Sequence, residues 1–227
     1  MASFKGEAGK RMYSLSCKKK IDSPYSSAFT GCGFMLDELV ALLPILQADN
    51  SDELIKRELG ENSILKLGKA KTRQRMMPEF KRRFNAMPRS FWNWFLLLDR
   101  AGKTIALYYC LLRSYLLLKD VHLNLFFPRL KSADPSVTKA DVLRYILKIA
   151  AQDEFVDSWS DATKGRVASS CIAFIRMIGM LDSKGDGLKS VTIDVQLAAD
   201  FISRGESWYL EALGMPLFEI NRIKERM

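Results

Sequence analysis

Residues 90–128, SFWNWFLLLDRAGKTIALYYCLLRSYLLLKDVHLNLFFP, are the most apolar stretch of the chain. Aromatic and aliphatic side chains fill it, apart from a polar break at 99–103 that contains Gly102. Pro128 closes the stretch, because proline lacks the backbone donor that a continuing helix needs. The pattern predicts helices buried at the centre of a protein core.

Part of this stretch, residues 105–118, is apolar enough to suggest a membrane helix. A spanning helix needs about 20 largely uncharged residues, but Arg113 interrupts this run. Charged residues also lie on both sides of it: Asp99, Arg100, Lys103, Lys119 and Asp120. We therefore expect no membrane insertion. No apolar segment follows the basic N-terminal residues as it would in a signal peptide, so we expect a cytoplasmic protein.

The composition excludes several protein classes. The chain has 227 residues, of which 48% are hydrophobic and 11% aromatic, which suffices for a core and excludes a disordered tail. The four cysteines are far apart and form no C-x-x-C pair: Cys17, Cys32, Cys110 and Cys171. This spacing argues against a zinc ribbon or a disulfide framework and favours a reducing compartment.

The sequence around the apolar stretch is typical of helices. Apolar residues recur at helical spacing in 36–46 and again in 69–84, where Met76, Phe80 and Phe84 share a face. The pair at 62–63, Asn-Ser, can cap a further short helix. Thr138 and Asp141 have the spacing of a capping box, and Gly179 is placed to end a helix that begins after Ser160. The tail 196–227 predicts two more helices.

A short segment near the end of this helical series has a different pattern. The turn DSKGDG at 182–187 is followed by Val191, Ile193 and Val195, which alternate with polar residues. A glycine-rich turn before a period of two predicts a β-hairpin. Helix, helix and hairpin is the order of a winged helix-turn-helix, in which the helix before the hairpin enters the major groove of DNA.

We therefore predict a mainly α, compact helical protein with a small winged-helix-like β-hairpin in its C-terminal half. Three parts are expected along the chain: a basic flexible arm at 1–23, an N-terminal helical domain at 24–130, and a C-terminal helical domain at 137–227 with the hairpin near 180–195. The linker is KSADPS at 131–136, which is rich in turn formers.

The net charge of +9 is concentrated in two places. Residues 1–20 carry six basic side chains against one Glu, a net +5. Residues 66–83 carry eight against Glu79, a net +7, which leaves −3 for the other 189 residues. Clustered Lys and Arg release counterions from phosphates, so this distribution indicates a polyanion as partner.

The segment 66–83 is the primary candidate binding site. Its cations are Lys66, Lys69, Lys71, Arg73, Arg75, Lys81, Arg82 and Arg83. A solvated helix face usually mixes both signs of charge, whereas here only Glu79 opposes eight cations. Phosphates of a DNA duplex are the favoured partner; an ordinary solvated face, an acidic protein or a lipid are the alternatives.

The predicted winged region offers a second set of candidates. Lys164 and Arg166 would lie on its outer helix face, and Lys184 and Lys189 near the hairpin tip. Lys18, Lys19 and Lys20 of the arm are further auxiliary candidates. Acidic and basic residues balance over 138–195, however, which counts against this region as the main phosphate-binding surface.

The sequence shows no catalytic motif. With one histidine, His122, a Ser-His-Asp triad or an H-E-x-x-H metal site is nearly excluded. Gly-Lys pairs occur, but none within GxxxxGK[ST]. We expect no enzyme activity, metal or cofactor.

Three segments together resemble the BrxA family, a component of BREX phage-resistance systems. They are SSAFTGCGFMLDEL (26–39), ELGENSILKLGKAKTRQRMMPEFKRRF (58–84) and WSDATKGRVASSCIAFIRMIGML (159–181). The family's boxes appear here as Glu61-Asn62-Ser63-Ile64, Arg83-Phe84, Trp159-Ser160 with Thr163 and Arg166, and Gly179-Met180-Leu181. The resemblance spans about residues 25–195 and leaves the basic arm outside.

The resemblance implies a small, mostly helical, non-enzymatic protein that binds double-stranded DNA beside other BREX components. Together with the charge clusters, it leads us to expect duplex binding mainly through phosphates, with little sequence preference. The alternative is an interaction scaffold whose basic surface docks an acidic partner protein of the same system. An enzyme with an unidentified carboxylate pair is a third, weaker alternative.

Overall fold

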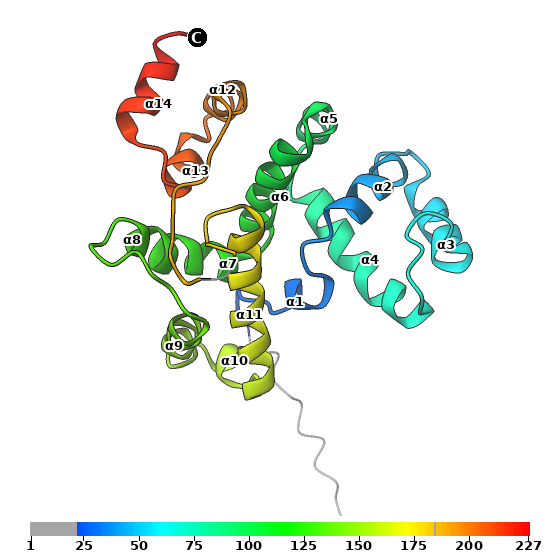
Figure 1. The fold of residues 1–227 in the computed structure, drawn as a ribbon. Helices are drawn as coiled ribbons and strands as arrows, with labels where there is room; N and C mark the ends of the chain where they lie inside the picture. Colours follow the sequence, from blue (N-terminus) through cyan, green and yellow to red (C-terminus); the bar gives the residue numbers. More distant parts are fainter. Residues whose placement is uncertain (1–21, 184) are drawn as a thin grey trace, which may run out of the picture.

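The computed structural model describes residues 22–183 and 185–227, and these residues form a series of helices (Figure 1). The first half comprises α1 (Phe29–Cys32), α2 (Leu36–Leu46), α3 (Ser51–Glu61), α4 (Ala70–Asn85), α5 (Arg89–Leu97), α6 (Arg100–Ser114) and α7 (Leu116–Val121). A π-helical turn η1 (His122–Phe126) and α8 (Phe127–Leu130) follow. The second half comprises α9 (Lys139–Ala150), α10 (Glu154–Asp157), α11 (Asp161–Met177), α12 (Val195–Ser203), α13 (Ser207–Ala212) and α14 (Leu217–Lys224).

The apolar stretch forms the centre of the fold, as the sequence predicts. Residues 105–112 of α6 are all buried, and Figure 1 shows α2–α4, α9–α11 and α12–α14 grouped around α6 and α7. The side chain of Asp99 caps α6 by accepting from the Gly102 backbone N–H at 2.7 Å. The run 105–118 is not one helix, because Tyr115 takes an extended conformation between α6 and α7.

His122 occupies this centre as a core residue. It is fully buried, and its two ring nitrogens lie 2.9 Å from the Tyr108 hydroxyl and 3.0 Å from the Ala212 carbonyl oxygen. A carbonyl accepts only, so Nε2 carries the proton and Nδ1 accepts from Tyr108. Burial lowers the pKa of His122 to about 4, so the ring is neutral at physiological pH.

The predicted winged-helix-like hairpin is wrong. Within the described residues there is no β-strand, and only two isolated bridges occur, Ser136 with Gly187 and Leu181 with Leu188. Residues 191–194 pair with no strand: the Val191 N–H donates to the Leu213 carbonyl, and Asp194 caps α12. The alternating residues are therefore satisfied by contacts with helices, and Val195 already belongs to α12.

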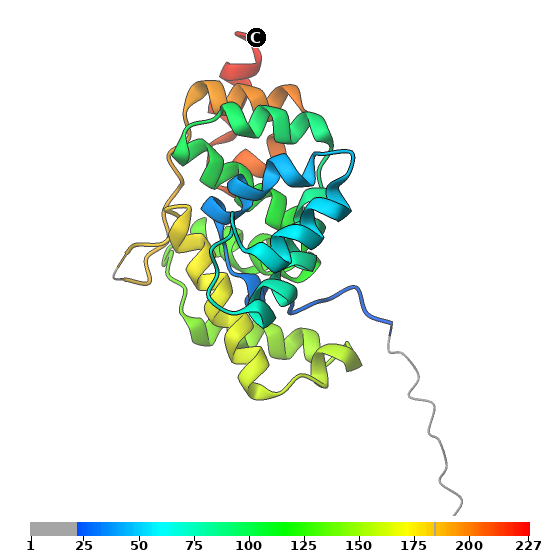
Figure 2. The ribbon, with the colours of Figure 1, turned by 90° about the vertical axis from the view of Figure 1, so that its right-hand side faces the viewer.

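Other local expectations are met or adjusted. The Thr138–Asp141 capping box is present at the start of α9, and Ser160 caps α11. Gly179 follows the last residues of α11 with φ 77°, the left-handed conformation that favours glycine. The tail contains α12, α13 and α14, one helix more than expected. Figure 2 shows the chain projecting from the body after α11 before it returns to α12.

Aromatic contacts cross from the predicted N-terminal half to the C-terminal half. Phe29 of α1 lies 6.0 Å from Phe174 of α11, measured between ring centroids, and Trp94 of α5 lies 5.5 Å from Phe201 of α12. The Tyr209 hydroxyl of α13 donates to the Ile105 carbonyl of α6 at 2.7 Å. The division into domains at 131–136 stays a prediction, and the arm 1–21 lies outside the described residues.

Candidate nucleic-acid interface

Helix α4 carries most of the basic segment and runs unbroken through Pro78. One face packs into the core through Met76, Met77 and Phe80, and the exposed cations of the helix lie in other directions around its axis. The helix has a single acidic residue, Glu79. Figure 2 shows α3 beside α4, and Lys81 uses this neighbour to form an ion pair of 2.6 Å with Asp52.

Five cations of the basic segment are exposed: Lys66, Lys69, Lys71, Arg75 and Arg82. At about 100° per residue, Lys71, Arg75 and Arg82 fall within about 40° of one another around α4. We call these three residues the α4 stripe. With a rise of about 1.5 Å per residue the stripe is roughly 16 Å long, comparable to the roughly 12 Å width of the major groove of DNA.

Most of these exposed cations have no acidic partner. Among the described residues, no carboxylate forms an ion pair with Lys66, Lys69, Lys71 or Arg75. Arg75 makes one weak contact, from Nη2 to the Gly31 carbonyl oxygen of α1 at 3.4 Å. The guanidinium and ammonium groups therefore remain available to an anion from outside.

Two predicted contact residues of the same segment are buried instead. Arg73 donates from Nη1 to the Leu67 carbonyl at 2.8 Å and from Nη2 to the Leu59 carbonyl at 3.1 Å. It thereby ties the loop between α3 and α4 to the helix. Arg83 is fully buried and donates to the carbonyls of Gly33 and Phe34. Both charges serve the fold and face away from solvent.

The helical positions of these two arginines could have predicted their burial, which a count of charges cannot do. Arg73 and Arg83 lie at the i and i+10 positions of the face that carries Met76, Met77 and Phe80, at i+3, i+4 and i+7. A charged residue on the core-facing side of a helix is expected to be buried with hydrogen-bonding partners, because an unpaired buried charge is costly. The partners here are backbone carbonyls of other segments, and the sequence does not indicate which carbonyls they are.

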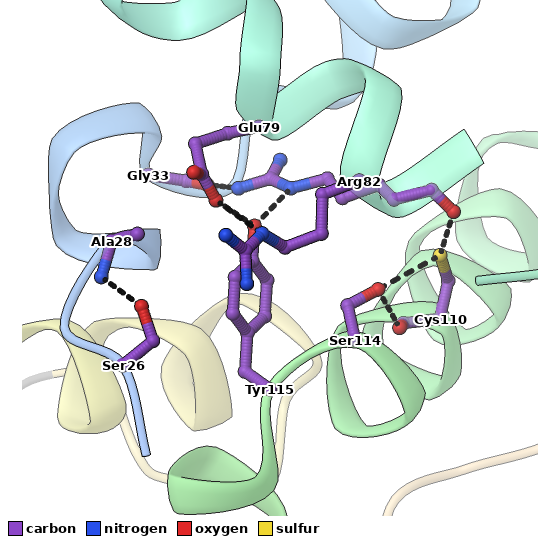
Figure 3. A network of polar contacts seen from close by, with 9 residues as sticks. Ser26, Ala28, Gly33, Glu79, Arg82, Cys110, Ser114 and Tyr115 are labelled. Atoms are coloured by element: carbon purple, nitrogen blue, oxygen red, sulfur yellow. Dashed lines mark hydrogen bonds and ion pairs between the residues drawn. The ribbon is translucent and has the colours of Figure 1, made fainter. Parts of the chain in front are cut away.

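A chain of polar contacts links α4 to Tyr115 (Figure 3). Arg83 donates from Nε to the Tyr115 hydroxyl at 3.4 Å, and this hydroxyl donates to Oε2 of Glu79 at 2.8 Å. Burial raises the pKa of Tyr115, and although nearby Arg83 lowers it, the hydroxyl stays protonated and able to donate. No motif in the sequence points to Tyr115, because its neighbours along the chain are mostly apolar.

Arg82 of the α4 stripe touches the same chain of contacts. Its Nε lies 3.4 Å from Oε2 of Glu79, and its guanidinium carbon lies 5.9 Å from the centre of the Tyr115 ring. Figure 3 shows Arg82, Glu79 and Tyr115 converging on one point. Arg82 remains 47% exposed, so solvent still reaches it.

Helix α11 divides its predicted contacts in the same way. Lys164 is buried and donates from Nζ to the Asp157 carbonyl at 2.9 Å. Arg166 is exposed, with Nη2 on the Thr163 hydroxyl at 3.2 Å. Lys189 forms an ion pair of 3.0 Å with Asp182. Lys18, Lys19, Lys20 and Lys184 lie outside the described residues.

Nothing in the described part of the chain gathers the donors of a metal site. Cys32, Cys110 and Cys171 are free and buried, and burial raises the pKa of Cys110 and of Cys171 to about 12. These thiols are held protonated, which makes them poor nucleophiles. Within residues 22–183 and 185–227, no helix combines the length and apolarity needed to cross a membrane.

Comparison with known proteins assigns the chain to a family. The BrxA family model matches residues 23–203, which include α4 and α11. The chain belongs to the BrxA family. BrxA is the component of BREX phage-resistance systems that the sequence motifs indicated, so membership gives this protein a BREX context.

A solved structure shares the BrxA fold of this chain. It is an uncharacterized protein from Magnetospirillum magneticum, superposed with a TM-score of 0.69 at 18% sequence identity. The similarity covers 84% of this chain and 98% of that one. At this identity the likeness concerns the fold alone. No curated protein matches the chain.

Proposed function

We propose that this BrxA protein binds double-stranded DNA through phosphate contacts made by the exposed cations of the basic segment, and that it catalyses no reaction. The observation that carries the proposal is a set of four exposed cations, none of which forms an ion pair with a carboxylate of residues 22–183 or 185–227: Lys66, Lys69, Lys71 and Arg75. No carboxylate in that part of the chain compensates their mutual repulsion, and a phosphate backbone would supply the compensating negative charge.

Surrounding aromatic residues favour duplex over single-stranded nucleic acid. Proteins that bind single strands stack bases on exposed aromatic rings, but the rings near the α4 stripe serve the core. Phe80 is fully buried, and Phe84 stacks on Trp92 with centroids 5.8 Å apart. Backbone contacts without base stacking suit a duplex, and they carry little sequence preference.

A salt titration tests the proposal. Binding of a labelled duplex of arbitrary sequence is followed by fluorescence anisotropy between about 50 and 200 mM salt. Five phosphate contacts predict a slope of log K against log salt concentration of roughly −4 to −5. Replacing Lys71, Arg75 and Arg82 together by Ala removes up to three contacts and reduces the magnitude of the slope by about 2 to 3.

The matched control removes three exposed cations elsewhere, by substituting Ala for Lys139, Lys148 and Lys224. It has the same change in net charge and should leave the slope nearly unchanged. Absence of duplex binding at low salt would contradict the proposal, and equal effects of the two triple variants would remove α4 from it. A protein complex that survives nuclease treatment and depends on the α4 stripe would support the scaffold alternative.

Absence of catalysis has its own test. The purified protein is incubated with plasmid and phage DNA in the presence of Mg²⁺ or Mn²⁺, and the products are resolved on gels and by nucleoside mass spectrometry. Unchanged DNA is the expected result; cleavage or base modification that scales with protein concentration would overturn this part of the proposal.

A further inference from the structure

Glu79 is the one acidic side chain of α4, and it lies beneath the α4 stripe. It is 8% exposed, whereas Arg82 three residues later is an exposed member of the stripe. The two form an i, i+3 ion pair through Oε2 of Glu79 and Nε of Arg82 at 3.4 Å. Among the described residues, Arg82 is therefore the one member of the α4 stripe that pairs with a carboxylate, and that carboxylate comes from the same helix.

The hydrogen bonding of Glu79 does not depend on Arg82. The same Oε2 accepts from the Tyr115 hydroxyl at 2.8 Å, and Tyr115 is held in turn by Arg83. A buried carboxylate that lost its only partner would carry a large desolvation cost. Here the Tyr115 bond remains, so Arg82 can leave Glu79 at low cost. Two positions of Arg82, on Glu79 or on an external phosphate, are both chemically satisfied.

We propose that Glu79 is an internal competitor that holds Arg82 away from phosphates and thereby lowers the affinity of the α4 stripe for DNA. The inference rests on the proposed function and deepens it, because it identifies a residue that sets the strength of that interaction. Glu79 acts through Arg82 and touches no phosphate itself, so it is a positioning residue for the stripe.

The test is a double-mutant cycle on duplex affinity with the variants Glu79→Gln, Arg82→Ala and both together. The Gln side chain keeps an oxygen that accepts from Tyr115 but no longer holds a cation. Since partly exposed ion pairs contribute about 0.2 to 1 kcal/mol, Glu79→Gln should raise the affinity by roughly 1.4- to 5-fold at low salt. Because Arg82 reaches phosphate in the DNA complexes of both proteins, the slope of log K against log salt concentration should stay nearly unchanged.

The Arg82→Ala background separates the competition from a general charge effect. If Glu79 acts through Arg82, Glu79→Gln changes the affinity of the Arg82→Ala protein by much less than it changes that of the wild type. Equal gains in the two backgrounds would mean that Glu79 merely adds a repulsive charge, and no gain in the wild-type background would mean that it does not compete. Either result overturns the inference.

An NMR measurement on the wild-type protein covers the case in which Glu79→Gln fails to fold. The Nε–H resonance of Arg82 should shift on addition of duplex, as its partner changes from carboxylate to phosphate. An unshifted resonance at saturating DNA overturns the inference. Failure of the proposed function is distinguishable, because Lys71→Ala with Arg75→Ala would then leave duplex binding unaffected, whatever Glu79→Gln does.

Discussion

Arg83 of α4 donates from Nη1 to the backbone carbonyl oxygen of Phe34 at 2.8 Å, across 49 residues of sequence. The carbonyl belongs to the segment between α1 and α2, which has no helical partner for it. A second nitrogen of Arg83 serves the neighbouring carbonyl of Gly33. One guanidinium thus fixes the position of α4, and with it the α4 stripe, against the segment between α1 and α2.

We predict that Arg83→Ala destabilises the protein by on the order of 3 to 5 kcal/mol, because it leaves buried carbonyls unpaired and opens a cavity. Arg75→Ala, which removes an exposed cation of the same helix, should change the free energy of unfolding by less than about 0.5 kcal/mol. Urea denaturation of both variants measures the difference. Similar values for the two would show that the Arg83 contacts contribute little.

Glu58 holds the loop between α3 and α4. Its carboxylate accepts from the backbone N–H groups of Ser63, Ile64 and Leu65 at 2.8–3.1 Å, and from the Ser63 hydroxyl. Burial raises the pKa of Glu58, but these hydrogen bonds outweigh burial and hold it below the usual value. The short helix predicted from the Asn-Ser pair at 62–63 does not form; the chain there is this loop, which is hydrogen-bonded to the Glu58 carboxylate.

We therefore predict that Glu58→Gln destabilises the protein by about 2 to 3 kcal/mol at neutral pH, since a neutral amide accepts fewer and weaker bonds. Because the folded-state pKa is depressed, the stabilisation is present above the unfolded pKa and is lost as the pH falls through the folded value. The gap between wild type and variant should shrink on acidification. Glu61→Gln, an exposed change nearby, is the control.

We predict a second loss of stability in acid from His122, whose pKa is lowered by burial of the ring and not by hydrogen bonds to its charged form. Its pKa is lowered from 6.5 to about 4 by burial, so the unfolded chain binds a proton that the folded protein excludes. Stability is then lost as the pH falls from about 6.5 to 4, by on the order of 3 kcal/mol. In His122→Gln this part of the pH dependence should vanish. Thermal melts of both proteins over this range provide the measurement; parallel curves would contradict a buried neutral imidazole.

Two glycines of the C-terminal helices should respond differently to alanine. Gly214 has φ 92°, and a Cβ there would lie 2.5 Å from Ser190 Oγ and 2.8 Å from Leu130 Cδ2. Gly205 has φ 77°, and a Cβ there would meet nothing within 4 Å. We expect Gly205→Ala to cost about 1 to 2 kcal/mol from backbone strain alone, and Gly214→Ala distinctly more. Equal losses in calorimetry would mean that the Ser190 and Leu130 side chains yield freely.

Much of the local structure follows from short-range chemistry in the sequence. The Thr138–Asp141 capping box, the Ser160 cap and the left-handed Gly179 each depend on residues within a few positions, so their energies are local. The three BrxA boxes likewise stand in the sequence, and the family match confirms the membership that they indicated. The hairpin prediction was wrong because the pairing of a strand depends on distant segments. The five-residue alternation at 191–195 does not specify which segment will lie against it.

Pattern and composition were enough to predict a helical protein with a buried apolar centre and a basic segment at 66–83, and the resemblance of three segments to a known family indicated BrxA. Which of the eight cations in that segment face solvent depends instead on how the helices pack. Arg73 and Arg83 are satisfied by carbonyls of other segments, and Arg82 by Glu79, while Lys71 and Arg75 stay without a carboxylate partner among the described residues. Net charge is a sum over residues, whereas the availability of a charge depends on desolvation and on partners that folding brings from far along the chain.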